Sequence, residues 1–138
     1  MQTHFTLAQL ANPMFREAEK EIRTCVHCGF CLATCPTYVL LGDERDSPRG
    51  RIYLIKKMLE GGHAATATVT HHIDRCLSCF ACVTTCPSGV DYRKLLDHAR
   101  VHIEQTFSRP ITDKFARWWL IKILPSPWLF RLALAGAR

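Results

Sequence analysis

The sequence predicts a mainly α-helical fold. Three segments begin with a helix-capping residue followed by apolar residues at helical spacing, and no segment alternates apolar and polar residues as a half-buried strand would. The 138 residues, of which 48% are hydrophobic and 22% charged, suffice for one domain with a modest core. We therefore expect a helical domain over residues 1–108 and a helical tail over residues 109–138.

The three helices are expected after Asn12, Ser47 and Asp91. Asn12 and Ser47 are each followed by proline, which suits the first helical position. The apolar faces, in chain order, are Phe15, Ala18 and Ile22; Ile52, Ile55 and Leu59; Tyr92, Leu95, Leu96, Ala99 and Ile103. The carboxylates expected to face water on the first helix are Glu17, Glu19 and Glu21. Residues 63–72 have weak periodicity, and the histidines expected to be exposed loop residues there are His63, His71 and His72.

All eight cysteines fall in two copies of one motif, C-x2-C-x2-C-x3-C-P. The first copy is Cys25, Cys28, Cys31 and Cys35, and the second is Cys76, Cys79, Cys82 and Cys86. This spacing is typical of iron–sulfur proteins, because three thiolates two residues apart can converge from one loop on three irons of a cubane cluster. The sequence therefore predicts two [4Fe–4S] clusters.

The fourth cysteine of each motif is expected to bind the cluster of the other motif, since the chain has turned away by that position. The first cluster is then held by Cys25, Cys28, Cys31 and Cys86, and the second by Cys76, Cys79, Cys82 and Cys35. His27 lies inside the first motif, but four thiols already complete each set, so we interpret it as a loop residue. The apolar candidates to shield the clusters from water are Val26, Phe30, Leu32, Leu77, Phe80 and Val83.

Other uses of the cysteines fit the spacing less well. Zinc sites usually take four ligands as two pairs, which leaves no use for a third thiol at this spacing. Disulfides suit an oxidising compartment, whereas the N-terminal residues lack the basic region and apolar run of a secretory signal. We therefore expect reduced thiols and a cytoplasmic protein. Because the ligands are loop residues, the apoprotein is expected to be largely unstructured around both motifs.

The formal net charge of +6 resides mainly in the tail. Residues 109–138 carry six basic residues against one acidic residue, whereas residues 1–108 carry twelve against eleven. No basic stripe with interleaved aromatic residues lies near the cysteines, so nucleic-acid binding is not expected.

The tail is expected to form two helices, one from Thr112 to a break at Pro125 and one after Ser126. Both are too short and too interrupted by charge to cross a membrane. Three tryptophans among basic residues suit packing on protein or peripheral association with a membrane surface.

Sequences beside the motifs resemble a known family. These are Cys-Pro-Thr-Tyr after the first motif, Asp-Ser-Pro-Arg-Gly-Arg-Ile at the second helix start and Cys-Pro-Ser-Gly-Val after the second motif. They resemble the N-terminal part of the iron–sulfur subunit of glycolate oxidase, within a wider group of helical two-cluster ferredoxins that includes heterodisulfide reductase and anaerobic glycerol-3-phosphate dehydrogenase subunits. Carried over, all eight cysteines are cluster ligands. Family members continue into domains with Cys-Cys-Gly sequences, whereas this chain has no cysteine after Cys86, so a truncated electron-relay part is expected.

The resemblance implies an iron–sulfur subunit that relays single electrons. In the family, a flavin-containing subunit oxidises a 2-hydroxy acid such as glycolate to glyoxylate, and clusters pass the electrons to an acceptor, a quinone or a carrier protein. Lactate, glycerol-3-phosphate and heterodisulfide oxidoreductases stay open, as does a non-redox interaction module built on a structural metal. No nucleophile–base pair, carboxylate dyad or glycine-rich nucleotide loop stands out, so no catalytic residue is assigned and the chain alone is expected to catalyse nothing.

Overall fold

The computed structural model describes residues 1–136, and within that range the protein contains helices and no strand. The prediction of a mainly α fold is therefore confirmed. The chain divides into two compact units, one of residues 1–107 and one that starts at Ser108. Each unit is described by itself below.

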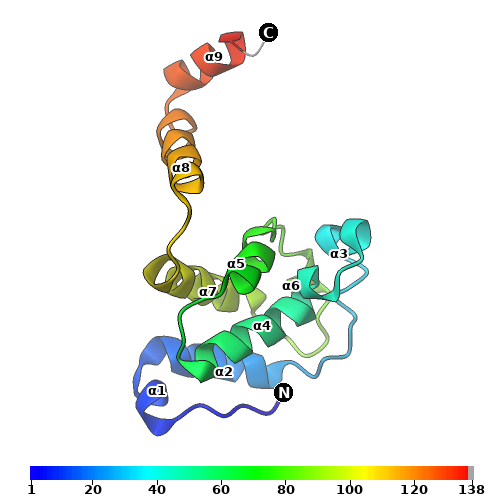
Figure 1. Ribbon diagram of the computed structural model, residues 1–138. Helices are drawn as coiled ribbons and strands as arrows, with labels where there is room; N and C mark the ends of the chain where they lie inside the picture. The colour runs from blue at the N-terminus through cyan, green and yellow to red at the C-terminus, as the bar shows by residue number, and fades with distance from the viewer. Residues whose placement is uncertain (137–138) are drawn as a thin grey trace. The chain divides into compact units, whose positions relative to one another are not determined.

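The first unit is built around three helices that pack on one another. Its elements in chain order are α1 (Leu7–Ala11), α2 (Pro13–Thr24), α3 (Pro36–Leu41), the 3-10 turn η1 (Glu44–Asp46), α4 (Pro48–Gly61), α5 (Ala67–Asp74), α6 (Ala81–Thr84) and α7 (Tyr92–Thr106) (Figure 1). Helices α2, α4 and α7 contact one another, α1 packs on α2, and α5 packs on α4 and α7. The three helices predicted from the sequence are α2, α4 and α7.

The first two of these helices begin as their capping residues predict. Asn12 Oδ1 accepts a hydrogen bond from the N–H of Met14 at 3.0 Å, and Ser47 Oγ accepts from the N–H of Gly50 at 2.9 Å. Helix α4 ends at Gly61 and is capped by Gly62, whose left-handed φ of 59° glycine adopts without strain. The start of α7 differs from the prediction, because its capping residue makes no side-chain hydrogen bond to the helix.

At the start of α7, the Asp91 side chain makes no cap hydrogen bond. Its carboxylate instead pairs with Arg93 Nε at 3.0 Å. Helix α7 therefore begins at the predicted place without the predicted cap.

Apolar residues from the three helices form one core. The fully buried members on the predicted apolar faces are Ala18, Ile22, Ile55, Leu59, Leu95, Leu96, Ala99 and Ile103, and Ile73 of α5 is buried with them. Full burial of an aliphatic side chain of this size contributes about 1.5–3 kcal/mol. The core thus fixes the helices between which the two cysteine motifs are held.

Glu21 does not face water as expected. Its residue is only 9% exposed, and Oε2 accepts a hydrogen bond from the N–H of Asp91 at 2.7 Å. The N–H groups at a helix start lack partners within the helix, so a carboxylate from α2 supplies one to α7. Glu17 and Glu19 are partly exposed, which agrees better with the expectation.

Residues 63–72 also depart from the expectation, because most of them belong to α5. Thr66 Oγ1 caps this helix by accepting from the N–H of Val69 at 3.3 Å. His63 and His71 are exposed as expected, whereas His72 is only 3% exposed. Packing against α4 and α7 supports a helix whose own periodicity is weak.

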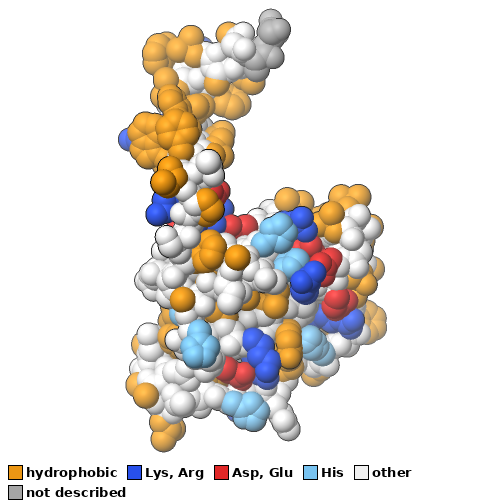
Figure 2. All heavy atoms as spheres, in the orientation of Figure 1, with side chains coloured by type: hydrophobic (Ala, Val, Ile, Leu, Met, Phe, Trp, Pro, Cys, Tyr) orange, Lys and Arg blue, Asp and Glu red, His pale blue; other side chains and the backbone are white. Residues whose placement is uncertain are grey.

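The second unit contains α8 (Ile111–Ile123) and α9 (Pro127–Gly136), separated at Pro125 as predicted. Aromatic side chains gather along α8, where Phe115, Trp118 and Trp119 contact one another with ring centroids 5.4–6.4 Å apart. Apolar side chains of both helices are exposed (Figure 2). Among residues 1–136, every helix is too short or too polar to span a bilayer.

Candidate metal centre

A cavity in the first unit is lined by cysteines from both motifs. Cys76, Cys79 and Cys82 come from the second motif, and Cys35 comes from the first. We call this cavity the Cys35 pocket. Its other lining residues are Pro36, Thr37, Pro48, Arg51, Leu77, Phe80 and Tyr92.

A second cavity, the Cys86 pocket, has the converse composition. Cys25 and Cys31 of the first motif line it together with Cys82 and Cys86 of the second. Its other lining residues are Pro48, Ile52, Val90 and Tyr92. Cys28 lines neither cavity, and its side chain is exposed.

The two pockets adjoin each other, since Pro48, Cys82 and Tyr92 line both. Helix α4 begins at Pro48 and α7 begins at Tyr92, so two helix N-termini lie at the boundary between the pockets. The N-terminus of a helix carries partial positive charge, which favours an anionic group nearby. The pockets are therefore suited to thiolates and to clusters of net negative charge.

The two motifs share one feature of backbone conformation. In each, the residues on both sides of the second cysteine have left-handed φ angles: His27 (59°) and Gly29 (86°) in the first, Ser78 (54°) and Phe80 (56°) in the second. For residues other than glycine this conformation is strained, typically by about 1–3 kcal/mol, and it persists where a site requires it. The same strained turn at both motifs indicates that it shapes the cysteine pockets.

The eight thiols are free in this structure, and burial disfavours the ionisation of two of them, Cys31 and Cys82. Burial and the neighbouring Cys76 raise the pKa of Cys82 to about 12. Burial also raises the pKa of Cys31, although backbone hydrogen bonds from Arg49 and from Cys31 itself act to lower it. These two thiols therefore favour the protonated form until a metal displaces the proton.

A buried arginine reaches the sulfur of Cys35. Arg51 is 1% exposed, and its Nε donates to the carbonyl oxygen of His72 at 2.7 Å. Its Nη2 donates to Thr37 Oγ1 at 3.1 Å and to Asp46 Oδ1 at 3.3 Å. Its Nη1 lies 3.8 Å from Cys35 Sγ, within reach of a hydrogen bond to sulfur. The guanidinium is thus held in one orientation against a cysteine of the pocket.

Asp46 is the centre of this buried network. It is fully buried, and its carboxylate accepts from Arg51, from His72 Nδ1 at 3.0 Å and from Arg75 Nη1 at 3.0 Å. Burial acts to raise the pKa of Asp46, but the hydrogen bonds from His72 and Arg75 outweigh it and the pKa lies below its ordinary value. The carboxylate therefore remains ionised between two guanidinium groups.

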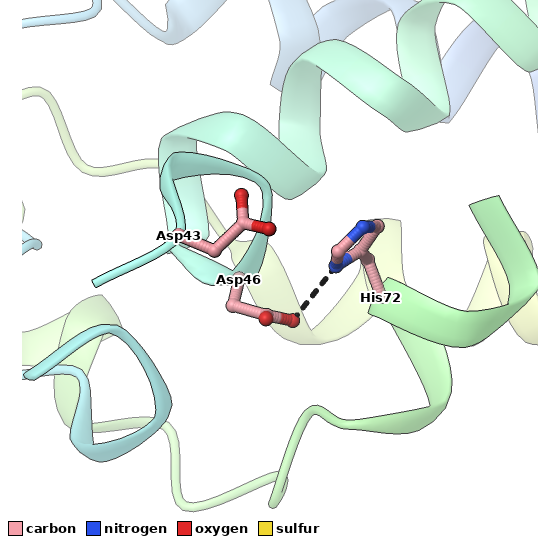
Figure 3. A group of neighbouring side chains, drawn as sticks. All are labelled: Asp43, Asp46 and His72. Atoms are coloured by element: carbon pink, nitrogen blue, oxygen red, sulfur yellow. Dashed lines mark hydrogen bonds and ion pairs between the residues drawn. The ribbon is translucent and has the colours of Figure 1, made fainter. Parts of the chain in front are cut away.

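Asp43, Asp46 and His72 lie close together beside this network (Figure 3), with one potential ligand atom from each within 4.8 Å of the others. However, both carboxylates already form ion pairs with arginines and need no metal ion to balance their charge. Arg45 pairs with Asp43 at 2.7 Å, and Arg75 pairs with Asp46. We therefore interpret these three residues as part of an ion-pair cluster that links η1 to α5, and not as a metal site.

The sequence prediction missed Arg51, Asp46 and His72 as members of the site. A signal for Arg51 is its spacing, since Arg51, Ile55 and Leu59 are four residues apart and share one face of α4. A charged residue on an apolar face indicates a buried ion pair. The six residues predicted to shield the clusters differ in burial. Val26, Phe30 and Leu77 are exposed, although Leu77 lines the Cys35 pocket. Leu32 is partly buried, and Phe80 and Val83 pack against the core.

Comparison with known proteins gives the family of this region. Residues 24–90 match the family model described as a 4Fe-4S dicluster domain. This stretch is a 4Fe–4S dicluster domain. The donor set fits its cofactors, because the eight free thiols have the spacing expected for cubanes and seven of them line two adjoining pockets. The prediction of two [4Fe–4S] clusters is therefore confirmed.

The chain that carries the dicluster domain is similar to iron–sulfur subunits of larger proteins. It is 53% identical over 131 residues to the "Glycolate oxidase iron-sulfur subunit" of Escherichia coli (strain K12), covering 95% of this chain and 32% of that protein. It is 40% identical over 120 residues to the "Probable glycolate oxidase iron-sulfur subunit" of Bacillus subtilis (strain 168), covering 85% and 27%.

A third relative comes from the wider group. The chain is 32% identical over 85 residues to an iron–sulfur subunit of the CoB–CoM heterodisulfide reductase of Methanopyrus kandleri, covering 61% of this chain and 41% of that protein. The chain thus spans roughly a third of the length of the curated relatives it matches. The predicted resemblance is confirmed. No solved structure matches the chain.

Proposed function

We propose that the chain is an electron-transfer iron–sulfur subunit, or part of one, that works with a flavin-containing dehydrogenase oxidising glycolate to glyoxylate. The observation that carries this proposal is the pair of adjoining pockets, each lined by cysteines of both motifs, within a dicluster domain. The 53% identity to a glycolate oxidase iron–sulfur subunit supports the choice of glycolate over lactate, glycerol 3-phosphate or a heterodisulfide.

We further propose that ligands cross between the motifs. Cys35 lies among the cysteines of the second motif, and Cys86 lies beside Cys25 and Cys31 of the first, which supports the crossing. The two sets are Cys76, Cys79, Cys82 and Cys35 in the Cys35 pocket, and Cys25, Cys28, Cys31 and Cys86 in the Cys86 pocket. Cys28 belongs to its set because the turn around it matches the turn around Cys79, which lines the Cys35 pocket.

When bound, [4Fe–4S] clusters accept and release one electron at a time. The residues of this chain bind the clusters, hold them side by side and tune their surroundings. Pro48 and Tyr92 line both pockets, so the path between the clusters is short. The oxidation of the 2-hydroxy acid belongs to the flavin-containing partner, and the acceptor is a quinone or a carrier protein.

We place cluster binding in residues 1–108 and treat residues 109–138 as a basic tail that contacts further protein or a membrane surface on the cytoplasmic side. The charge of the tail, six basic residues against one acidic residue, supports this division.

Anaerobic purification and reduction by substrate test the proposal. The chain is expected to contain about eight irons. A flavin-dependent glycolate dehydrogenase with glycolate should bleach its visible absorbance, and the matched dehydrogenases with L-lactate or glycerol 3-phosphate should not. A colourless protein with about two zinc ions would instead indicate a structural metal module. A brown protein that glycolate leaves oxidised would contradict the assigned donor.

A further inference from the structure

The two pockets differ in the side chains that face cysteine sulfur. In the Cys35 pocket, Arg51 Nη1 lies 3.8 Å from Cys35 Sγ, and the Tyr92 hydroxyl donates to Cys76 Sγ at 3.8 Å. Thr37 Oγ1 lies 3.2 Å from Cys35 Sγ. Within the described residues 1–136, no side-chain hydrogen bond of this kind is found at the sulfurs of the first motif's Cys25, Cys28 and Cys31 or at Cys86. The side-chain hydrogen bonding of the two pockets is therefore unequal, whereas backbone N–H groups of Arg49 and Cys31 serve the sulfur of Cys31.

Of the side chains near Cys35 Sγ, Arg51 is the one that can still donate a hydrogen bond to the sulfur once Cys35 binds iron. A cysteine ligand loses its own proton to bind metal, so Cys35 then only accepts hydrogen bonds. The Thr37 hydroxyl already donates to the carbonyl oxygen of Asp46 at 2.9 Å. A guanidinium keeps its protons in proteins, and that of Arg51 stays directed at Cys35.

The charge of Arg51 is also only partly compensated. Its carboxylate partner, Asp46, is shared with Arg75, so two guanidinium groups face one carboxylate. Arg75 is partly exposed and screened by water, whereas Arg51 is buried at the pocket wall. A positive charge in a poorly screened place stabilises the reduced form of a cluster, which carries one more negative charge than the oxidised form. Such charges and hydrogen bonds to sulfur set cluster potentials.

We propose that Arg51, with Tyr92, makes the cluster of the Cys35 pocket the one of higher reduction potential, and so directs electrons from the Cys86 pocket toward it. The proposal rests on the electron-relay function proposed above. In this step one electron leaves the reduced cluster of the Cys86 pocket and enters the oxidised cluster of the Cys35 pocket. No bond is formed or broken and no proton moves. The electron comes from the partner flavin, or from dithionite in the test.

Arg51 acts through the cysteine sulfur and is a positioning residue. Besides its contact with sulfur, the Arg51 guanidinium donates hydrogen bonds to three oxygen atoms: the carbonyl oxygen of His72, Thr37 Oγ1 and Asp46 Oδ1. A lysine could keep the charge but could not occupy these positions together, since its ammonium is a single point. Charge and orientation can therefore be separated by substitution.

The test is a redox titration of the full-length holoprotein, followed by EPR, with dithionite and mediators. The wild type is expected to show two midpoint potentials. Arg51→Gln should shift the higher one toward the lower and leave the lower one in place, and Arg51→Lys should shift it less. The control is Arg45→Gln, which removes the same charge from an exposed residue of η1 that touches no sulfur, and which should change neither potential.

Iron content and circular dichroism show whether each variant keeps its clusters and fold. If Arg51→Gln loses iron, Tyr92→Phe decides, because it removes only the hydroxyl that donates to Cys76 in the same pocket. A fall of the higher potential in Tyr92→Phe supports the proposal, and unchanged potentials overturn it.

A single shared wild-type potential, or a shift of the lower potential in iron-replete Arg51→Gln, would also overturn it. Because these titrations need no partner, their result is independent of whether glycolate dehydrogenase reduces the chain.

Discussion

Cys35 lines a pocket with three cysteines of the second motif, and Cys86 lines one with Cys25 and Cys31 of the first. Crossed ligands predict a particular pattern of iron loss in serine variants. Cys35→Ser with Cys76→Ser should remove one cluster and leave about four irons, because both residues serve the same cluster. Cys35→Ser with Cys25→Ser should remove both clusters.

Iron analysis after anaerobic reconstitution measures this pattern. The two double variants are matched, since each contains Cys35→Ser and one further serine. Loss of both clusters in the first double variant and of one in the second would show that each motif holds its own cluster.

Glu21 gives a second prediction at the scale of one side chain. Glu21→Ala leaves the N–H of Asp91 without its partner in a partly buried place, so the free energy of unfolding should fall by about 1–3 kcal/mol. Anaerobic urea unfolding followed by circular dichroism measures it. Asp97→Ala, at an exposed position of α7, serves as the control and should change stability little. Equal effects of the two substitutions would contradict the role given to Glu21.

The sequence predicted single residues where their role follows from local spacing. The cysteines were identifiable because three ligands of one cluster lie within seven residues of chain. Arg51 and His72 were not, because their burial depends on Asp46, which reaches them only after α4 and α5 have packed. Glu21 was misassigned for the same reason, since its partner lies 70 residues away in the chain.

Among the helices, too, those set by local sequence were predictable and those set by tertiary packing were not. The starts of α2 and α4 were predictable because Asn12 and Ser47 act on N–H groups within three residues. Helix α5 was missed because its support comes from α4 and α7. Helices α3 and α6 are short pieces beside the cysteine pockets, too short to be stable by themselves.

The loop of the first motif depends on Gly29. Its φ is 86°, and a Cβ there would lie 2.6 Å from Arg49 Nη1. Gly29→Ala should therefore strain the loop and speed the loss of clusters on heating. Ser78→Gly makes the opposite change at the corresponding turn, where φ is 54°, and should slow that loss or leave it unchanged.

The decay of visible absorbance at a fixed temperature under anaerobic conditions measures both variants. If Gly29→Ala decays no faster than the wild type, the left-handed turn is not a requirement of the site.

For the whole molecule, the clusters and the apolar core support different parts of the first unit. Helices α2, α4 and α7 share one core, and parts of the cysteine loops pack against it. The two loops would be joined to each other only through bound clusters. Anaerobic removal of iron by a chelator should therefore increase amide hydrogen exchange most in residues 25–35 and 76–90. The core of α4 should lose less protection, and residues 108–136 should change little. Unchanged exchange in the two cysteine loops would contradict metal-dependent folding there.

The tail is the part of the molecule whose helices follow most directly from sequence. Pro125 separates α8 from α9 where it was expected to, because proline disfavours a continuous helix. The sequence also predicted the apolar face of α8, whose aromatic residues are exposed. It did not identify the protein or membrane surface that this face contacts.

The central claim is that two [4Fe–4S] clusters lie side by side in the adjoining pockets of one chain and carry electrons. EPR of the anaerobically reconstituted, dithionite-reduced protein tests it most directly. We expect about eight irons per chain and the split, broadened signal of two neighbouring reduced cubanes, which simplifies to one cubane in the variant that lacks Cys35 and Cys76. A protein that binds its full iron but gives no reducible cubane signal, or only the sum of two isolated ones, would contradict the claim.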